Sequence, residues 1–120
     1  VLLDQYDISY SLLAYGEFNN PDIQKLYDQF IEYGSENKAK ALEVGANIED
    51  LDIVDLAKFI DATTNSAMIQ VFESLRCGSR NHLRSFVNAI ELSGNTYEPQ
   101  YLTQEDYILI INDNQEQCGP

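Results

Sequence analysis

The single histidine of the chain, His82, and the carboxylate Glu49 are the residues whose types and positions best suit chemistry. Imidazole and carboxylate groups are common ligands of iron and other transition metals. Each of the two falls on the apolar stripe of a long amphipathic segment, where a core residue is expected. Because a carboxylate buried among aliphatic side chains is costly unless it is paired or bound to a metal, the pattern predicts half of a metal site inside a helix bundle.

The two stripes appear when the sequence is read at steps of three and four residues. Residues 65–93 give Met68, Val71, Leu75, Gly78, His82, Phe86 and Ala89, and residues 35–60 give Leu42, Ala46, Glu49, Ile53, Leu56 and Ile60. Since helices joined by a short turn pack antiparallel, we expect His82 and Glu49 to point toward each other in a shared hydrophobic interior. A second apolar face of the later helix also needs a partner; it consists of Ile69, Phe72, Leu83, Val87 and Ile90.

Asp52 follows Glu49 at a spacing of three residues, so the two carboxylates lie close enough on one helix to share a cation. Oxygen ligands with this spacing suit iron or manganese in helix bundles. The residues alone leave two other interpretations open. In the first, Asp52 is a solvated flanking residue. In the second, Glu49 and His82 form a hydrogen-bonded pair without a metal.

Three of the seven basic residues, Arg76, Arg80 and Arg84, form a row at intervals of four. They are placed to neutralise carboxylates of the neighbouring helix and to hold them in position around a metal. A solvent-exposed ladder with Glu73 is an equally open interpretation, and such a ladder contributes little stability.

Length, charge and cysteine content restrict the class of protein. The 120 residues suit one domain, and no segment approaches the ~20 apolar residues of a membrane span. With 20 acidic and 7 basic residues, the net charge of −13 repels nucleic acid and anionic membranes, so we expect neither as a partner. Cys77 and Cys118 are far apart, which predicts reduced thiols in a cytoplasmic protein, although a cleaved export signal would leave no trace.

Several segments have the apolar periodicity of helices and begin with N-cap residues, and none shows the period-two alternation of strands. This pattern predicts an all-α fold. Residues 1–6 begin abruptly with an apolar turn, so we interpret them as the end of a longer helix in a fragment or processed product. Asn20 before a proline and Ser35 after a glycine are predicted helix caps. The predicted helices, within one domain over 1–120, are 20–33, 35–60, 65–93 and 103–112.

Three motifs give the sequence a resemblance to a known family. They are GANIEDLDI at 45–53, GSRNHLRSF at 78–86 and YEPQYL at 97–102. In this order they closely resemble an uncharacterised prokaryotic family of ferritin-like proteins, which is related to the rubrerythrins and carries a domain of unknown function. The resemblance spans essentially the whole chain.

The resemblance implies a four-helix ferritin-like bundle whose inward carboxylates and histidines hold a di-iron centre. Glu49 matches the carboxylate of the third bundle helix, with Asp52 as a supplement, and His82 matches the histidine of the fourth. Ser79 stands where that histidine motif has its glutamate, and it lies beside Arg80 among the residues that would surround the ligands. The segment 1–6 matches the end of the second helix, so the first helix and most of the second are missing from this sequence.

For function, the resemblance implies iron as cofactor and an oxidase, peroxidase or iron-handling activity of the intact protein. A homo-oligomer or the missing N-terminal helices would complete the bundle. The alternative is a non-catalytic helical interaction module in which Glu49 and His82 only pair with each other. A further alternative is an acidic surface that binds cations diffusely.

Overall fold

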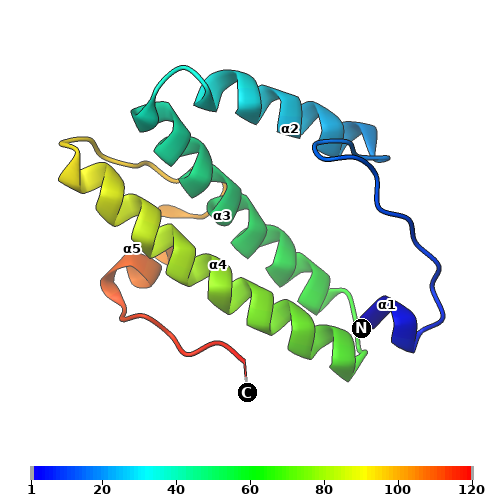
Figure 1. The fold of residues 1–120 in the computed structure, drawn as a ribbon. Helices are drawn as coiled ribbons and strands as arrows, with labels where there is room; N and C mark the ends of the chain where they lie inside the picture. The colour runs from blue at the N-terminus through cyan, green and yellow to red at the C-terminus, as the bar shows by residue number, and fades with distance from the viewer. Residues whose placement is uncertain (1, 120) are drawn as a thin grey trace.

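The computed structural model describes residues 2–119, and this part of the chain contains helices and no strand. The bounds agree with the predicted ranges to within three residues; Val1, which belongs to the predicted segment 1–6, lies outside the described residues. Figure 1 shows the five helices: α1 (Leu2–Gln5), α2 (Pro21–Gly34), α3 (Lys38–Asp61), α4 (Ser66–Leu92) and α5 (Gln104–Asn112).

Side-chain caps fix where the four longer helices begin. Asn20, Asn65 and Thr103 each accept hydrogen bonds from backbone amides in the first turn of the helix that follows. The predicted cap Ser35 is wrong for α3, because Asn37 accepts the amide of Lys40 and Ser35 instead ends α2. The capping residues therefore explain the helix positions that the sequence predicts.

The helices α3 and α4 pack antiparallel along most of their length and form the centre of the molecule (Figure 1). Gly45 permits their close approach, since a Cβ atom there would lie 2.4 Å from the ring of Phe86. The buried core consists of Ala46, Ile53, Leu83, Val87, Ile90, Tyr97 and Tyr107. Residues 95–103, here called the strap, and α5 return to close one side of this core, while α2 packs against α3.

The second apolar face of α4, which the sequence indicates must have a partner, forms the core, whereas the expectation that the stripe with Leu75 and His82 lies inward is wrong. Leu83 and Val87, from the second apolar face, are almost completely buried, whereas Leu75 of the expected stripe is 54% exposed. The strap and α5 cover the face of Leu83 and Val87, and this decides which side becomes the core. A different side of α3 and α4, here called the uncovered face, includes the side chains of Ile48, Phe59, Val71 and Leu75, which are exposed in residues 2–119.

The prediction of reduced thiols is also wrong. Cys77 of α4 and Cys118 form a disulfide that joins residues 41 positions apart. The chain after α5 runs back beside α4, and this path brings the two sulfur atoms together (Figure 1). The sequence does not indicate this disulfide, because the pairing depends on the path of the tail and not on a local motif.

None of the helices in residues 2–119 combines the length and the apolar character needed to cross a bilayer.

Candidate functional site

The structure brings Glu49 of α3 and His82 of α4 together, as the sequence predicts. His82 Nδ1 lies 3.2 Å from Glu49 Oε1, which is within hydrogen-bond distance. The antiparallel packing of α3 and α4 places the two side chains opposite each other, 33 residues apart in sequence. A carboxylate oxygen and an imidazole nitrogen are therefore presented side by side from two rigid elements.

The pair lies at the edge of the uncovered face and not in the interior. The His82 side chain is 65% exposed and the Glu49 side chain is 14% exposed. The expectation that both groups share a hydrophobic interior is therefore wrong for His82 in residues 2–119. An imidazole with an open side retains room for further ligands, which a buried hydrogen-bonded pair would not have.

Asp52 lies on α3 one turn beyond Glu49, and its residue is exposed. Desolvation raises the pKa of the Asp52 carboxyl, and the neighbouring charges of Glu49 and Asp55 raise it further. A bound cation would relieve this repulsion. However, residues 2–119 contain no group of three His, Cys, Asp or Glu side chains that could hold a metal ion among themselves.

The other residues predicted to surround the ligands face elsewhere. Ser79 is buried, at 6% exposure. Arg80 pairs with Glu116 of the C-terminal segment, at 2.6 Å, and not with the carboxylates of α3. Arg76 pairs with Glu73 at 2.9 Å, as in the ladder interpretation. The arginine row therefore does not neutralise Glu49 or Asp52.

Sequence analysis missed Asp50, whose carboxylate is fully buried. It has no exposed surface and accepts four hydrogen bonds within the strap: from the hydroxyl of Tyr97 and from three successive backbone amides, those of Gln100, Tyr101 and Leu102. The Asp50 carboxylate raises the pKa of the Tyr97 hydroxyl, after the larger effect of burial. Asp50 follows Ala46 by four residues and precedes Ile53 by three, and both are core residues. This spacing places Asp50 on the buried face of α3 and could have identified it.

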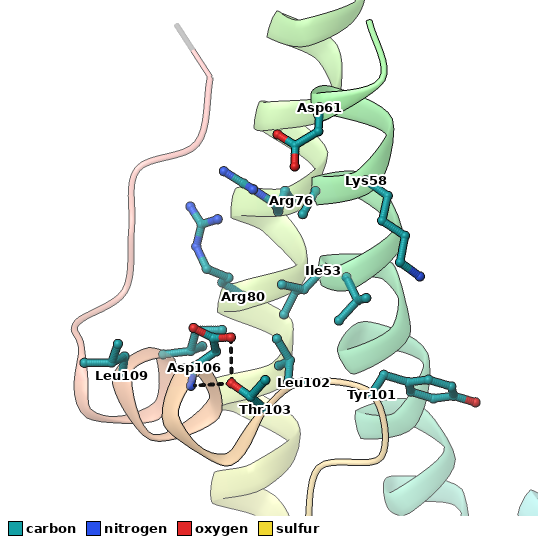
Figure 2. Close-up of a pocket in the computed structure, with 13 residues that line it drawn as sticks. Ile53, Lys58, Asp61, Arg76, Arg80, Tyr101, Leu102, Thr103, Asp106 and Leu109 are labelled. Carbon is teal, nitrogen blue, oxygen red and sulfur yellow. Dashed lines mark hydrogen bonds between the residues drawn. The ribbon is translucent and has the colours of Figure 1, made fainter.

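A groove of about 560 Å³ lies between α3, α4, α5 and the strap (Figure 2). Ile53, Leu102 and Leu109 supply apolar lining, and Arg76 and Arg80 supply cationic groups. Arg80 and His82 are two residues apart and so lie on different sides of α4, which separates the groove from the Glu49–His82 pair. The groove has the size of small-molecule sites, but Glu73 and Glu116 already neutralise its two arginines.

Comparison with known proteins places this geometry in a family. The uncharacterised protein domain DUF2202 matches residues 1–114. The chain belongs to the DUF2202 family. The chain is similar to the uncharacterised protein MJ0754 of Methanocaldococcus jannaschii, with 43% identity over 117 residues. That match covers 96% of this chain and 63% of MJ0754, so the chain spans less than two thirds of the length of its relative.

The crystal structure of MJ0754, described as a hypothetical protein, has the same fold. The two structures superimpose with a TM-score of 0.92 at 43% sequence identity, over 96% of this chain and 67% of the crystallised one. The likeness therefore supports the whole DUF2202 architecture described above, from α1 to α5.

Proposed function

We propose that this DUF2202 chain contributes a carboxylate–imidazole ligand pair, Glu49 and His82, to the metal site of a ferritin-like bundle. The observation that carries the proposal is the 3.2 Å separation of Glu49 Oε1 and His82 Nδ1 on facing helices. Asp52 is a carboxylate one turn beyond Glu49 on α3, but with this pair it does not form a set of three ligands in residues 2–119. Oxygen and nitrogen donors of this kind suit iron.

The two donors fit part of a site and not a complete one. With Ser79 in place of a glutamate and with no group of three ligand residues in the described chain, a symmetric di-iron set does not fit residues 2–119. A bound iron ion with open positions supplies redox chemistry. This chain's contribution is to hold the imidazole and the carboxylate on two rigid helices and to leave the far side of the imidazole accessible.

The uncovered face supports completion of the site by other helices. Val71 and Leu75 of α4 and Phe59 of α3 are 39%, 54% and 52% exposed. Exposed apolar side chains gathered on one face are typical of a contact surface. Since MJ0754 is longer than this chain, further helices or a second copy would cover the face and bring the remaining ligands of the intact bundle.

Metal analysis of protein purified without chelator and then loaded anaerobically with ferrous iron tests the proposal. We expect stoichiometric iron, with affinity at least about ten-fold lower in His82→Ala and in Glu49→Ala. Asn88→Ala on an exposed position of α4 and Glu105→Ala on α5 are matched controls that should bind as the wild type does. Equal iron binding by all five proteins would contradict the proposal.

The 3.2 Å contact itself favours a second candidate, a helical interaction module in which the pair is only a hydrogen bond. This alternative predicts no iron binding. It also predicts a favourable coupling between Glu49→Ala and His82→Ala in a double-mutant cycle of the free energy of unfolding.

A further inference from the structure

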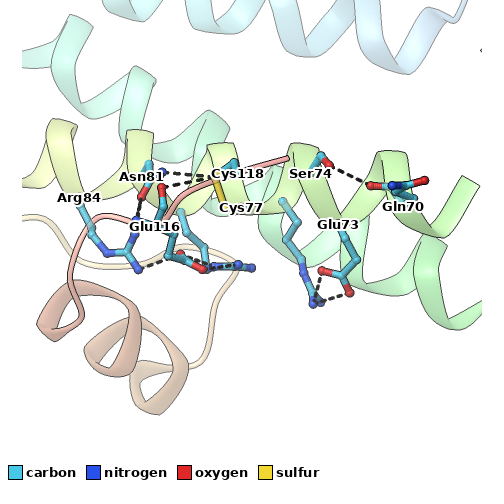
Figure 3. Close-up of a disulfide and its surroundings, with 10 residues drawn as sticks. Gln70, Glu73, Ser74, Cys77, Asn81, Arg84, Glu116 and Cys118 are labelled. Atoms are coloured by element: carbon cyan, nitrogen blue, oxygen red, sulfur yellow. Dashed lines mark hydrogen bonds and ion pairs between the residues drawn. A yellow bond between two sulfur atoms is a disulfide. The ribbon is translucent and has the colours of Figure 1, made fainter. Parts of the chain in front are cut away.

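The C-terminal tail, residues 113–119, is attached to α4 through the side chain of Glu116. Arg80 donates to both carboxylate oxygens of Glu116, from Nε at 2.7 Å and from Nη2 at 2.6 Å. Arg84 Nη2 donates to the same carboxylate at 3.0 Å (Figure 3). The planar fork of arginine matches a carboxylate, so the arrangement recognises this group specifically.

Asn81 recognises the backbone of the same tail residue. Its Oδ1 accepts the amide of Glu116 at 2.8 Å, and its Nδ2 donates to the carbonyl of Glu116 at 2.8 Å. These two hydrogen bonds bind the backbone of an extended peptide. A free anion has no backbone amide and carbonyl and could not form them. The three side chains from one stretch of α4 therefore bind a glutamate together with its own peptide groups.

Contacts outside the tail hold Arg84 in position. Arg84 donates from Nε to the carbonyl of Ile110 at 2.7 Å and from Nη1 to Asn81 Oδ1 at 2.8 Å. Only 8% of the Arg84 side chain is exposed. If Glu116 left, a nearly buried cation would lack its counter-charge, which is costly. The site therefore favours occupation by a carboxylate, and the hydrogen bond from Arg80 is the largest cause that lowers the pKa of Glu116, to about 2.

The disulfide keeps Glu116 in this site. Cys118, two residues beyond Glu116, is exposed, whereas Cys77 on α4 is buried at 8% exposure. A thiolate of a dithiol reductant can reach Cys118 Sγ, form a mixed disulfide there and release Cys77 as a thiolate that takes up a proton. The second thiol of the reductant then displaces Cys118. The protein gains two thiols, and the reductant becomes a disulfide.

We propose that Arg80, Asn81 and Arg84 form a binding site for a glutamate in an extended peptide segment. Glu116 is its tethered occupant, and reduction of Cys77–Cys118 by a dithiol makes the site available. The tail remains attached through α5 after reduction, so its high effective concentration makes it a strong competitor for any other peptide. This inference is independent of the metal site, because Arg80 and His82 lie on different sides of α4.

The test uses the full chain with Glu116→Gln, which removes the competing carboxylate. The probe is the blocked tetrapeptide Asn-Gln-Glu-Gln, which repeats the sequence of residues 114–117. We expect saturable binding to the reduced variant, followed through the side-chain Nε–H signals of Arg80 and Arg84. Binding to the oxidised variant should be at least about ten-fold weaker, because the disulfide holds the tail over the site.

Two controls give the test its specificity. A probe with glutamine in place of its glutamate should lose at least about ten-fold in affinity. Arg76→Gln in the same background should leave binding unchanged, since Arg76 pairs with Glu73 instead. Absence of binding to the reduced variant, or equal binding before and after reduction, would overturn the proposal.

A measurement on the wild-type chain covers the case in which Glu116→Gln fails to fold. Amide hydrogen exchange of Glu116, whose N–H is bonded to Asn81, should become at least about ten-fold faster on addition of the dithiol. Exchange that is unchanged by reduction would show that the disulfide does not control the tail.

Discussion

The carboxylate of Asp50, in the middle of α3, accepts a hydrogen bond of 2.9 Å from the hydroxyl of Tyr97, which lies 47 residues later in the strap. The same carboxylate receives three consecutive backbone amides of the strap, at 2.6, 3.0 and 2.7 Å. Side-chain oxygens thus replace the partners that a strand would give to an extended segment. Asp50 therefore anchors the strap to α3, on the side where the strap and α5 cover Leu83 and Val87 of α4.

Asp50→Ala should lower the free energy of unfolding by about 3–5 kcal/mol. The change leaves three backbone amides of the strap without an acceptor, and the Tyr97 hydroxyl keeps only its second acceptor, Asn47 Oδ1. Chemical denaturation followed by circular dichroism measures the change. Asp52→Ala, on the same helix but exposed, is the control and should change stability by less than about 0.5 kcal/mol. Similar losses in the two variants would contradict the assignment of Asp50 as the anchor of the strap.

Gly45→Ala should destabilise the protein although alanine favours helices. The added Cβ would lie 2.4 Å from the Phe86 ring, so α3 and α4 must separate or the ring must move, at a cost of about 1–3 kcal/mol. Gly78→Ala on α4 is a matched control, since its Cβ would meet no atom within 4 Å. This control should gain up to about 1 kcal/mol from helix propensity. Thermal unfolding of both variants checks the opposite signs.

The sequence was sufficient to predict the helices, because their signals are local. Asn20, which stands before a proline and is predicted as a cap, does cap α2 in the structure. The contact between Glu49 and His82 was also predictable, since it needs only two antiparallel amphipathic helices. Neither conclusion requires knowledge of how distant parts of the chain fold back.

The sequence was insufficient to predict features that depend on where the strap and the C-terminal tail pack against α3 and α4. α4 is apolar on two sides, and periodicity cannot tell whether Leu75 or Leu83 becomes the core residue. Asp50 and Glu49 are neighbours about 100° apart on one helix, so the choice between them depends on where the strap lies. The Cys77–Cys118 pairing depends on the path of the tail in the same way.

Replacing both Cys77 and Cys118 by serine should lower the free energy of unfolding by about 2–4 kcal/mol. The disulfide closes a loop between residues 41 positions apart, and its removal returns that conformational freedom to the unfolded chain. In chemical denaturation, the variant and the wild type treated with a reductant should have the same midpoint. A variant as stable as the oxidised wild type would show that the bond adds no stability to the fold.

Acid should weaken the attachment of the tail through Glu116. The pKa of this carboxyl falls from 4.5 to about 2 in the folded protein, because Arg80 and Arg84 donate to its charged form. A carboxyl whose pKa is lower in the folded state stabilises the fold fully above its unfolded pKa, and this contribution is lost as the pH falls through the folded pKa. The stability difference between the wild type and Glu116→Gln should therefore be constant above about pH 4.5 and should shrink between about pH 4.5 and about pH 2. Urea denaturation of both proteins across this range measures the difference, with Glu105→Gln on exposed α5 as the control that should follow the wild type. A difference that stays constant down to pH 2 would mean that Arg80 and Arg84 do not hold the Glu116 carboxylate in solution.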